Sequence, residues 1–318
     1  MWTAPFMTKR LISIVTPCYN EELNVREIYG RMRAVMEKLP EYRYEHIFID
    51  NASCDATVSI LREIAAIDKN VKVIVNARNF GHLRSPMHAF LQARGDAVGI
   101  LYADLQDPPE LFRDMIREWE KGTPIVAAIK SASDESGLMH GIRTAYYRLV
   151  ASLTDIKVLI HYTGFGLYDK TIVDILREKF TDPYPYFRGM IAELGLPHAE
   201  IEYKQKRRMR GITKNNFYTL YDLAMLGITN LSRVPLRLVI FCGFFSAMTS
   251  MILGIFYFVY KLVYWNSFSV GIAPLVLGLF FLGSVQLLAL GIIGEYVGSI
   301  HTFVQKRPLV IEKERINF

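Results

Sequence analysis

Apolar runs alternate with amphipathic segments along the first hundred residues of the chain. Leu11–Val15 is continuously apolar and stops at Thr16-Pro17, which is typical of a strand buried on both faces. Residues 22–39 then place apolar side chains at helical spacing, and this alternation repeats. The pattern predicts a doubly wound α/β sheet, mixed or parallel, with helices on both faces. The expected strands are 11–15, 45–50, 71–75 and 97–102, and the expected helices are 22–39, 55–67 and 85–94.

The last third of the chain has a different pattern. No charged residue occurs from Leu238 to Tyr260, and after Lys261 none returns until Glu295. A membrane-spanning helix needs roughly 20 apolar residues. The long stretch breaks at Trp265-Asn266-Ser267, so we predict a hairpin of two transmembrane helices, at about 238–260 and 272–294.

A basic run from Lys204 to Lys214 precedes the first span, and apolar residues at roughly helical spacing follow it. This order predicts an amphipathic helix lying in the membrane interface. We therefore expect three parts: a domain at 1–215, an interfacial helix at 216–234, and a membrane domain at 235–318 that ends in a cytoplasmic tail.

The charges flanking the spans predict the orientation. Arg233 and Arg237 precede the first span, and Lys306 and Arg307 follow the second, so both termini and the first domain are expected in the cytoplasm. Nothing resembling a signal peptide opens the chain. The net charge is +6, and its concentration near the membrane favours anionic lipid or phosphate over nucleic acid.

Polar residues follow each of the four expected strands. They are Tyr19–Glu22, Asp50–Ser53, Asn79–His82, and Asp104 with Asp107. Each set alone could be a loop or a helix cap, but together they lie at one edge of the sheet, where α/β proteins bind ligands.

The run Tyr102–Glu110 ends the fourth strand. Asp104 and Asp107 can hold a hard cation, which can clamp a diphosphate. A solvated turn is the alternative reading, because Asp-Pro often marks turns. The chain contains neither a Gly-x-Gly-x-x-Gly motif after the first strand nor a P-loop, and a metal-bridged diphosphate would need neither.

These motifs resemble the family 2 glycosyltransferases of GT-A fold, and among them the polyprenyl-phosphate glycosyltransferases, which include the bactoprenol glucosyltransferases and dolichol-phosphate mannose synthase. The resemblance covers essentially the whole chain. The matching segments are Thr16–Glu22, Ile49–Asp55, Arg78–Gly81, Ala103–Glu110, Phe187–Gly189 and Arg208–Lys214.

The resemblance implies roles for individual residues. Asp104 and Gln106 would meet a Mg²⁺ or Mn²⁺ ion that bridges the diphosphate, with Asp104, Asp107 and Arg208 as catalytic residues. Acceptor or leaving-group phosphate would meet Arg188, Arg208 and Lys214. The residues implied in nucleotide binding are Pro17, Tyr19, Glu21, Asp50, Asn79 and Gly81.

Three positions depart from the family pattern. Tyr102-Ala103-Asp104 stands where Asp-x-Asp is frequent, so one metal carboxylate is missing, and Asp107 or water would complete the shell. Asp50-Asn51 stands where Asp-Asp is common, and Gly164 precedes Phe165 where some relatives have an acidic residue.

The implied reaction is the inverting transfer of one sugar to a polyprenyl phosphate at the cytosolic face of the bacterial inner membrane. A phosphate monoester is already ionised at pH 7, so a strong general base is not required. The bacterial branch suggests UDP-glucose as donor, with GDP-mannose or a UDP-N-acetylhexosamine as alternatives.

Two other functions stay open. A processive polysaccharide synthase usually carries Gln-x-x-Arg-Trp, and none of Trp2, Trp119 and Trp265 has that context. A non-catalytic nucleotide-sugar-binding membrane protein would bind nucleotide without transferring sugar. The small residues Gly291, Gly294 and Gly298 could pack helices within the hairpin or between the protomers of a homo-oligomer.

Overall fold

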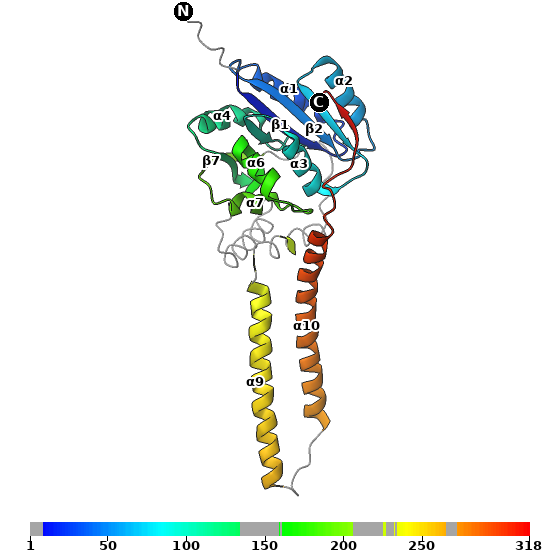
Figure 1. Ribbon diagram of the computed structural model, residues 1–318, viewed down its shortest axis with the longest axis vertical. Coiled ribbons are helices and arrows are strands. Elements are labelled where there is room, and N and C mark those ends of the chain that lie inside the picture. The colour runs from blue at the N-terminus through cyan, green and yellow to red at the C-terminus, as the bar shows by residue number, and fades with distance from the viewer. Residues whose placement is uncertain are drawn as a thin grey trace, which may run out of the picture.

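A computed structural model describes residues 9–133, 159, 161–205, 225–226, 232, 234–264 and 272–318. They form an α/β domain from which two long helices extend side by side (Figure 1). The α/β fold class and the C-terminal pair of apolar helices are as predicted from the sequence. The expected interfacial helix at 216–234 lies almost entirely outside the described residues, as do Arg208 and Lys214.

The domain is built on one mixed sheet of eight strands in the order β7-β5-β6-β4-β1-β2-β3-β8. The four expected strands form its parallel centre, because β1 pairs in parallel with both β2 and β4, and β2 with β3. The pairs β4–β6, β5–β6 and β3–β8 are antiparallel. The strands are β1 (Leu11–Cys18), β2 (Arg43–Asp50), β3 (Val71–Asn76), β4 (Ala97–Ile100), β5 (Ile125–Ser133), β6 (Tyr162–Asp169), β7 (His198–Gln205) and β8 (Glu312–Ile316).

Helices cover both faces of this sheet. On one face α1 (Val25–Met36), α2 (Thr57–Ile67) and α4 (Phe112–Glu120) contribute to one hydrophobic core. On the other face a second core takes side chains from the remaining helices of the domain, and burial of these two apolar layers is the main force holding the domain together. Those helices are α3 (Gly81–Gln92), α6 (Lys170–Lys179) and α7 (Phe187–Glu193), and a short 3-10 turn, η1 (Pro109–Leu111), precedes α4.

The C-terminal tail returns to the domain, which the sequence pattern did not suggest. Residues Glu312–Ile316 form β8, which covers the edge of β3 (Figure 1). The Asn317 side chain adds hydrogen bonds from Nδ2 to the carbonyl oxygens of Ala65 (2.7 Å) and Val71 (2.9 Å). The segment that follows the second long helix is thereby hydrogen-bonded to the sheet.

The long helices are α9 (Val234–Val263) and α10 (Ile272–Val304). Each contains a 27-residue stretch long and apolar enough to cross a membrane, Val234–Tyr260 and Gly278–Val304. Their large apolar side chains are exposed, including Phe244, Phe256 and Leu287. Such extensive apolar exposure is unfavourable in water and suits a lipid environment.

Candidate active site

The parallel strands end together at one edge of the sheet, and the chain turns sharply after three of them. Asn20 follows β1, Ala52 follows β2 and Leu105 follows β4, with φ values of 55°, 62° and 59°. This left-handed conformation costs residues such as alanine and leucine roughly 1–2 kcal/mol, whereas asparagine adopts it more easily. Strained backbone of this kind concentrates at functional sites, so its repetition along one edge marks that edge as a candidate site.

The loop after β4 separates its side chains into two sets. Asp104 and Gln106 are half-buried on the open side, whereas Leu105 and Asp107 are each only 2% exposed. The Asp104 carboxylate accepts a hydrogen bond of 3.2 Å from the backbone N–H of Gln106, which holds the turn. The loop therefore presents one carboxylate and one amide together.

Asp107 points into the protein and is held there by β7. Its Oδ1 accepts hydrogen bonds from the Tyr203 hydroxyl at 2.5 Å and from Nε2 of Gln205 at 3.5 Å. Lys130, on β5, donates in turn to Oε1 of Gln205 at 2.7 Å. Burial raises the pKa of Asp107 to about 6. Asp107 thus joins the loop after β4 to the ends of β5 and β7.

Asp50 orders the loops that follow β1 and β2. Its buried carboxylate accepts hydrogen bonds from the Ser53 hydroxyl and from the Ser53 backbone N–H (2.9 Å), and the Asn20 N–H donates to the same hydroxyl at 2.8 Å. Burial raises the pKa of Asp50. The other residues implied in nucleotide binding from this part of the chain, Pro17, Tyr19 and Glu21, are half-buried along the same edge.

Asn51 explains one departure from the family pattern. Its Nδ2 donates to Oδ1 of Asn79 (2.9 Å) and to the Gly81 carbonyl (3.1 Å). Its Oδ1 accepts from Asn76 Nδ2 (3.1 Å) and from the Phe80 N–H (2.9 Å). Only an amide can donate and accept in this way, since an ionised carboxylate is an acceptor only. The amide fixes the loop after β3 and with it Asn79 and Gly81.

Arg188, in the first turn of α7, reaches the same edge. Its Nη1 donates to the Tyr162 carbonyl at 3.4 Å. Desolvation lowers the pKa of His82, and the charge of Arg188 lowers it further. The charge of Arg188 also lowers the pKa of Tyr102, whereas the charges of Asp107 and Asp104 raise it. The structure therefore brings Arg188, the loop after β4 and the start of α3 together.

Tyr102 stands where the family often has a carboxylate. Its hydroxyl donates to the Thr163 carbonyl at 3.1 Å, and burial raises its pKa to about 12. The side chain therefore stays neutral. Across the residues that the structure describes, no three His, Cys, Asp or Glu side chains gather closely enough to hold a metal ion.

Comparison with known proteins identifies the family. The model of glycosyl transferase family 2 matches residues 13–191, which is more than half of the chain. The chain belongs to this family. It is therefore a glycosyltransferase, and its α/β domain has the GT-A fold.

Relatives of this family 2 glycosyltransferase match it along nearly its whole length. The uncharacterized glycosyltransferase YkcC of Bacillus subtilis is 35% identical over 94% of this chain and 92% of its own. Bactoprenol glucosyl transferase of Shigella phage SfII is 33% identical over 95% of this chain and 97% of its own. Among solved structures, glucosyl-3-phosphoglycerate synthase from Mycobacterium tuberculosis, in complex with Mn²⁺, UDP and its product, covers 72% of this chain and 84% of its own, with 18% identity and a TM-score of 0.46.

The structure of this glycosyltransferase adds site residues that the sequence pattern did not single out. Tyr203 and Gln205 hold Asp107 by hydrogen bonds, and Lys130 in turn holds Gln205. The alternation of polar and apolar residues in β7 just before the basic run was the available signal for Tyr203. For Lys130 no local signal exists, because β5 pairs with β7 across 75 residues of chain.

Proposed function

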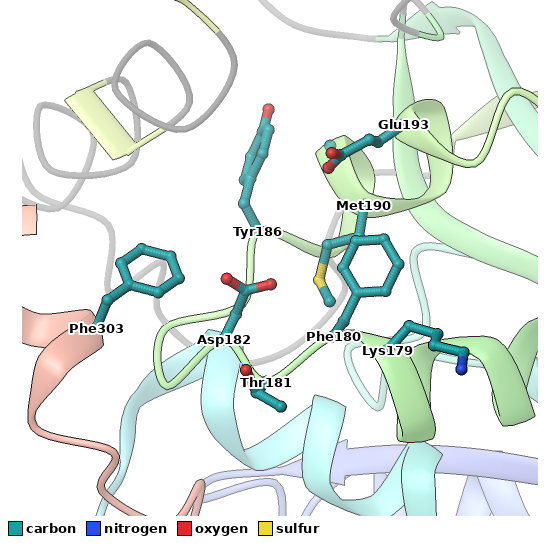
Figure 2. A pocket seen from close by; sticks show the side chains of 9 residues that line it. Lys179, Phe180, Thr181, Asp182, Tyr186, Met190, Glu193 and Phe303 are labelled. Atoms are coloured by element: carbon teal, nitrogen blue, oxygen red, sulfur yellow. The ribbon is translucent and has the colours of Figure 1, made fainter. Parts of the chain in front are cut away.

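We propose that this enzyme transfers a single sugar, with inversion, from a nucleotide sugar to a polyprenyl phosphate at the membrane surface. UDP-glucose is the proposed donor. The observation that carries the proposal is the position of α7. Its Arg188 reaches the sheet edge, while its Met190, with Tyr186 just before the helix, lines a cavity of about 340 Å³ together with Phe303, from the last turn of α10 (Figure 2).

This arrangement suits an acceptor whose head is polar and whose tail is apolar. The helix that carries Arg188 shares this cavity with the last turn of α10, a helix long enough to span a membrane, so a lipid phosphate could reach the sheet edge while its tail stays in the bilayer. The bactoprenol glucosyl transferases among the relatives support both a polyprenyl acceptor and a glucosyl donor.

The loop after β4 fits a divalent cation. Asp104 and Gln106 offer oxygen atoms, which Mg²⁺ and Mn²⁺ prefer, on the side of the loop open to a ligand. One or two protein ligands are sufficient for such an ion when substrate phosphates and water complete its coordination. When bound, the ion would neutralise the charge of the departing nucleoside diphosphate.

The chain's own residues would position the two anions. Asp107, buried against Tyr203, acts through the loop and is a positioning residue in this proposal. Arg188 would offset the repulsion between the acceptor phosphate and the donor diphosphate. The phosphate oxygen attacks the anomeric carbon from the face opposite the diphosphate, which inverts the configuration. Arg208 and Lys214, outside the described residues, would add cations for the acceptor.

Sugar transfer into lipid tests the proposal. The full chain in detergent is given undecaprenyl phosphate and labelled UDP-glucose, with magnesium, manganese or EDTA. We expect metal-dependent, mild-acid-labile label in the organic phase. For Asp104→Asn we expect the turnover of sugar transfer to fall by about 100-fold or more. Asp114→Asn is the matched control, because the Asp114 side chain on α4 is 49% exposed and lies outside the candidate site, so this variant should keep normal turnover.

Each other outcome has a distinct meaning. Label from GDP-mannose or UDP-N-acetylglucosamine, but none from UDP-glucose, would change the donor and keep the reaction. Nucleotide binding without transfer from any donor would favour the non-catalytic alternative. Near-normal turnover of Asp104→Asn would contradict the metal role.

A further inference from the structure

A second group of cations lies where α10 meets the domain. Arg84, on α3, donates from Nη2 to the Pro308 carbonyl at 2.6 Å, which ties α3 to the segment after α10. The guanidinium carbons of Arg78 and Arg84 lie 4.1 and 5.3 Å from the ring centroid of Phe80. Phe80 is itself only 6% exposed. Arg78, Arg84 and Arg307 are called the junction cluster below.

No carboxylate balances the junction cluster within the described part of the chain. The three arginines make no ion pair there, and Nε of Arg84 is buried without a hydrogen-bond partner. Burial lowers the pKa of Arg84, and the charges of Arg78 and Arg307 lower it further. Like charges gathered on a partly buried site repel one another, so a bound anion would stabilise the arrangement.

The position of the cluster indicates which anion is available. α10 ends at Val304, so Arg307 lies three residues beyond its last turn, next to exposed Lys306. If α10 spans the membrane, as the proposed function requires, these cations lie at the depth of the lipid headgroups. Arginine binds phosphate through two parallel hydrogen bonds, and basic clusters next to a spanning helix attract anionic lipid.

We propose that the junction cluster is a binding site for the phosphate of an anionic membrane phospholipid, separate from the acceptor site at Arg188. Phe80 orients two of the guanidinium groups, and Pro308 fixes one of them beside the end of α10. A phospholipid bound here would hold the domain against the membrane through α3 and the start of the C-terminal tail. The site rests on the proposed membrane location but not on the identity of the sugar.

Native mass spectrometry of the full chain in detergent tests the site by counting retained lipids. The probes are phosphatidylglycerol, phosphatidylcholine and undecaprenyl phosphate. We expect the wild type to retain phosphatidylglycerol in preference to phosphatidylcholine, and the double variant Arg84→Gln/Arg307→Gln to bind phosphatidylglycerol at least about tenfold more weakly. The matched control is Arg113→Gln/Arg117→Gln, which removes the same charge from exposed positions of α4.

Three results would overturn the proposal. The wild type could retain phosphatidylglycerol and phosphatidylcholine equally, or the α4 control could lose as much phosphatidylglycerol binding as the double variant. In the third, the double variant binds undecaprenyl phosphate more weakly with phosphatidylglycerol binding unchanged, which would assign the cluster to the acceptor. If the double variant does not fold, Arg307→Gln alone serves, because Arg307 is exposed. Lipid binding without sugar transfer would reject the proposed function and leave this site intact.

Discussion

At the scale of single residues, hydrogen bonds to buried polar groups decide how the site is arranged. Asp107 belongs to the same acidic motif as Asp104, yet it turns inward to Tyr203, whereas Asp104 stays at the surface of the site. Asn51 joins two loops because its amide both donates and accepts. Residue type in the sequence predicted the chemistry of these positions but not the direction in which each side chain points.

Tyr203→Phe tests the role of Asp107. The substitution removes the 2.5 Å hydrogen bond and leaves a buried carboxylate less well satisfied, which should cost about 1–3 kcal/mol of stability. Because the loop of Asp104 loses its anchor, we also expect kcat to fall. Steady-state kinetics of sugar transfer, together with thermal unfolding, measures both effects.

Tyr44→Phe is the control for that variant. The Tyr44 hydroxyl also donates to a carboxylate, Asp68 at 3.2 Å, but neither residue belongs to the candidate site. We expect a modest loss of stability with kcat unchanged. If the two variants lower kcat equally, the anchoring role of Tyr203 is wrong.

At the scale of elements, β2 carries a buried histidine at the centre of the sheet. His46 is fully buried, shares a 2.8 Å hydrogen bond between Nε2 and the Thr16 hydroxyl, and stacks on Phe48 with ring centroids 4.0 Å apart. Desolvation lowers its pKa to about 3. The imidazole is therefore neutral in the folded protein throughout the physiological pH range.

His46 should make the domain sensitive to acid. The unfolded chain protonates His46 near pH 6.5 and the folded chain only near 3, so stability is present above pH 6.5 and is lost as the pH falls below it. The loss approaches about 1.4 kcal/mol per pH unit. Chemical unfolding in detergent between pH 7 and 4.5 should show a shallower pH dependence for His46→Gln than for wild type; parallel curves would contradict this.

The edge strand β8 should stabilise β3. Asn317→Ala removes two hydrogen bonds, to the carbonyls of Ala65 and Val71, and places alanine at a φ of 62° that asparagine tolerates better. We expect a lower Tm and faster amide hydrogen exchange in Val73–Val75. Lys313→Ala, an exposed change within β8, is the control. Unchanged exchange in β3 would show that the tail is not needed there.

At the scale of the whole molecule, one exposed cysteine can report the orientation in the membrane. Cys54 is exposed three residues before α2, whereas Cys18 is buried, and Cys242, although exposed, lies within the apolar stretch of α9. If the domain is cytoplasmic, an impermeant maleimide should label inside-out vesicles but not right-side-out vesicles. Cys54→Ser should abolish that label, and labelling of intact right-side-out vesicles would contradict the orientation.

Local pattern was enough to predict the four central strands, the helices between them and the two apolar helices. Burial of one face imposes an apolar period of 2 residues on a strand and 3.6 residues on a helix, and full burial or a membrane span imposes an uninterrupted apolar run. Such patterns involve neighbouring residues and can be read directly from the sequence. The local pattern also predicted that Asp50, Asn79 and Asp104 would lie at one edge of the sheet, because parallel strands bring their carboxyl ends together.

Only the tertiary structure decided the rest. The sheet order, the antiparallel placement of β6, the return of the tail as β8 and the inward turn of Asp107 all depend on partners far away in the chain. Tyr203 lies 96 residues from Asp107, and β8 lies more than 200 residues from β3. Contacts at such separations arise from packing and from satisfying buried polar groups, which leave no periodic trace in the sequence.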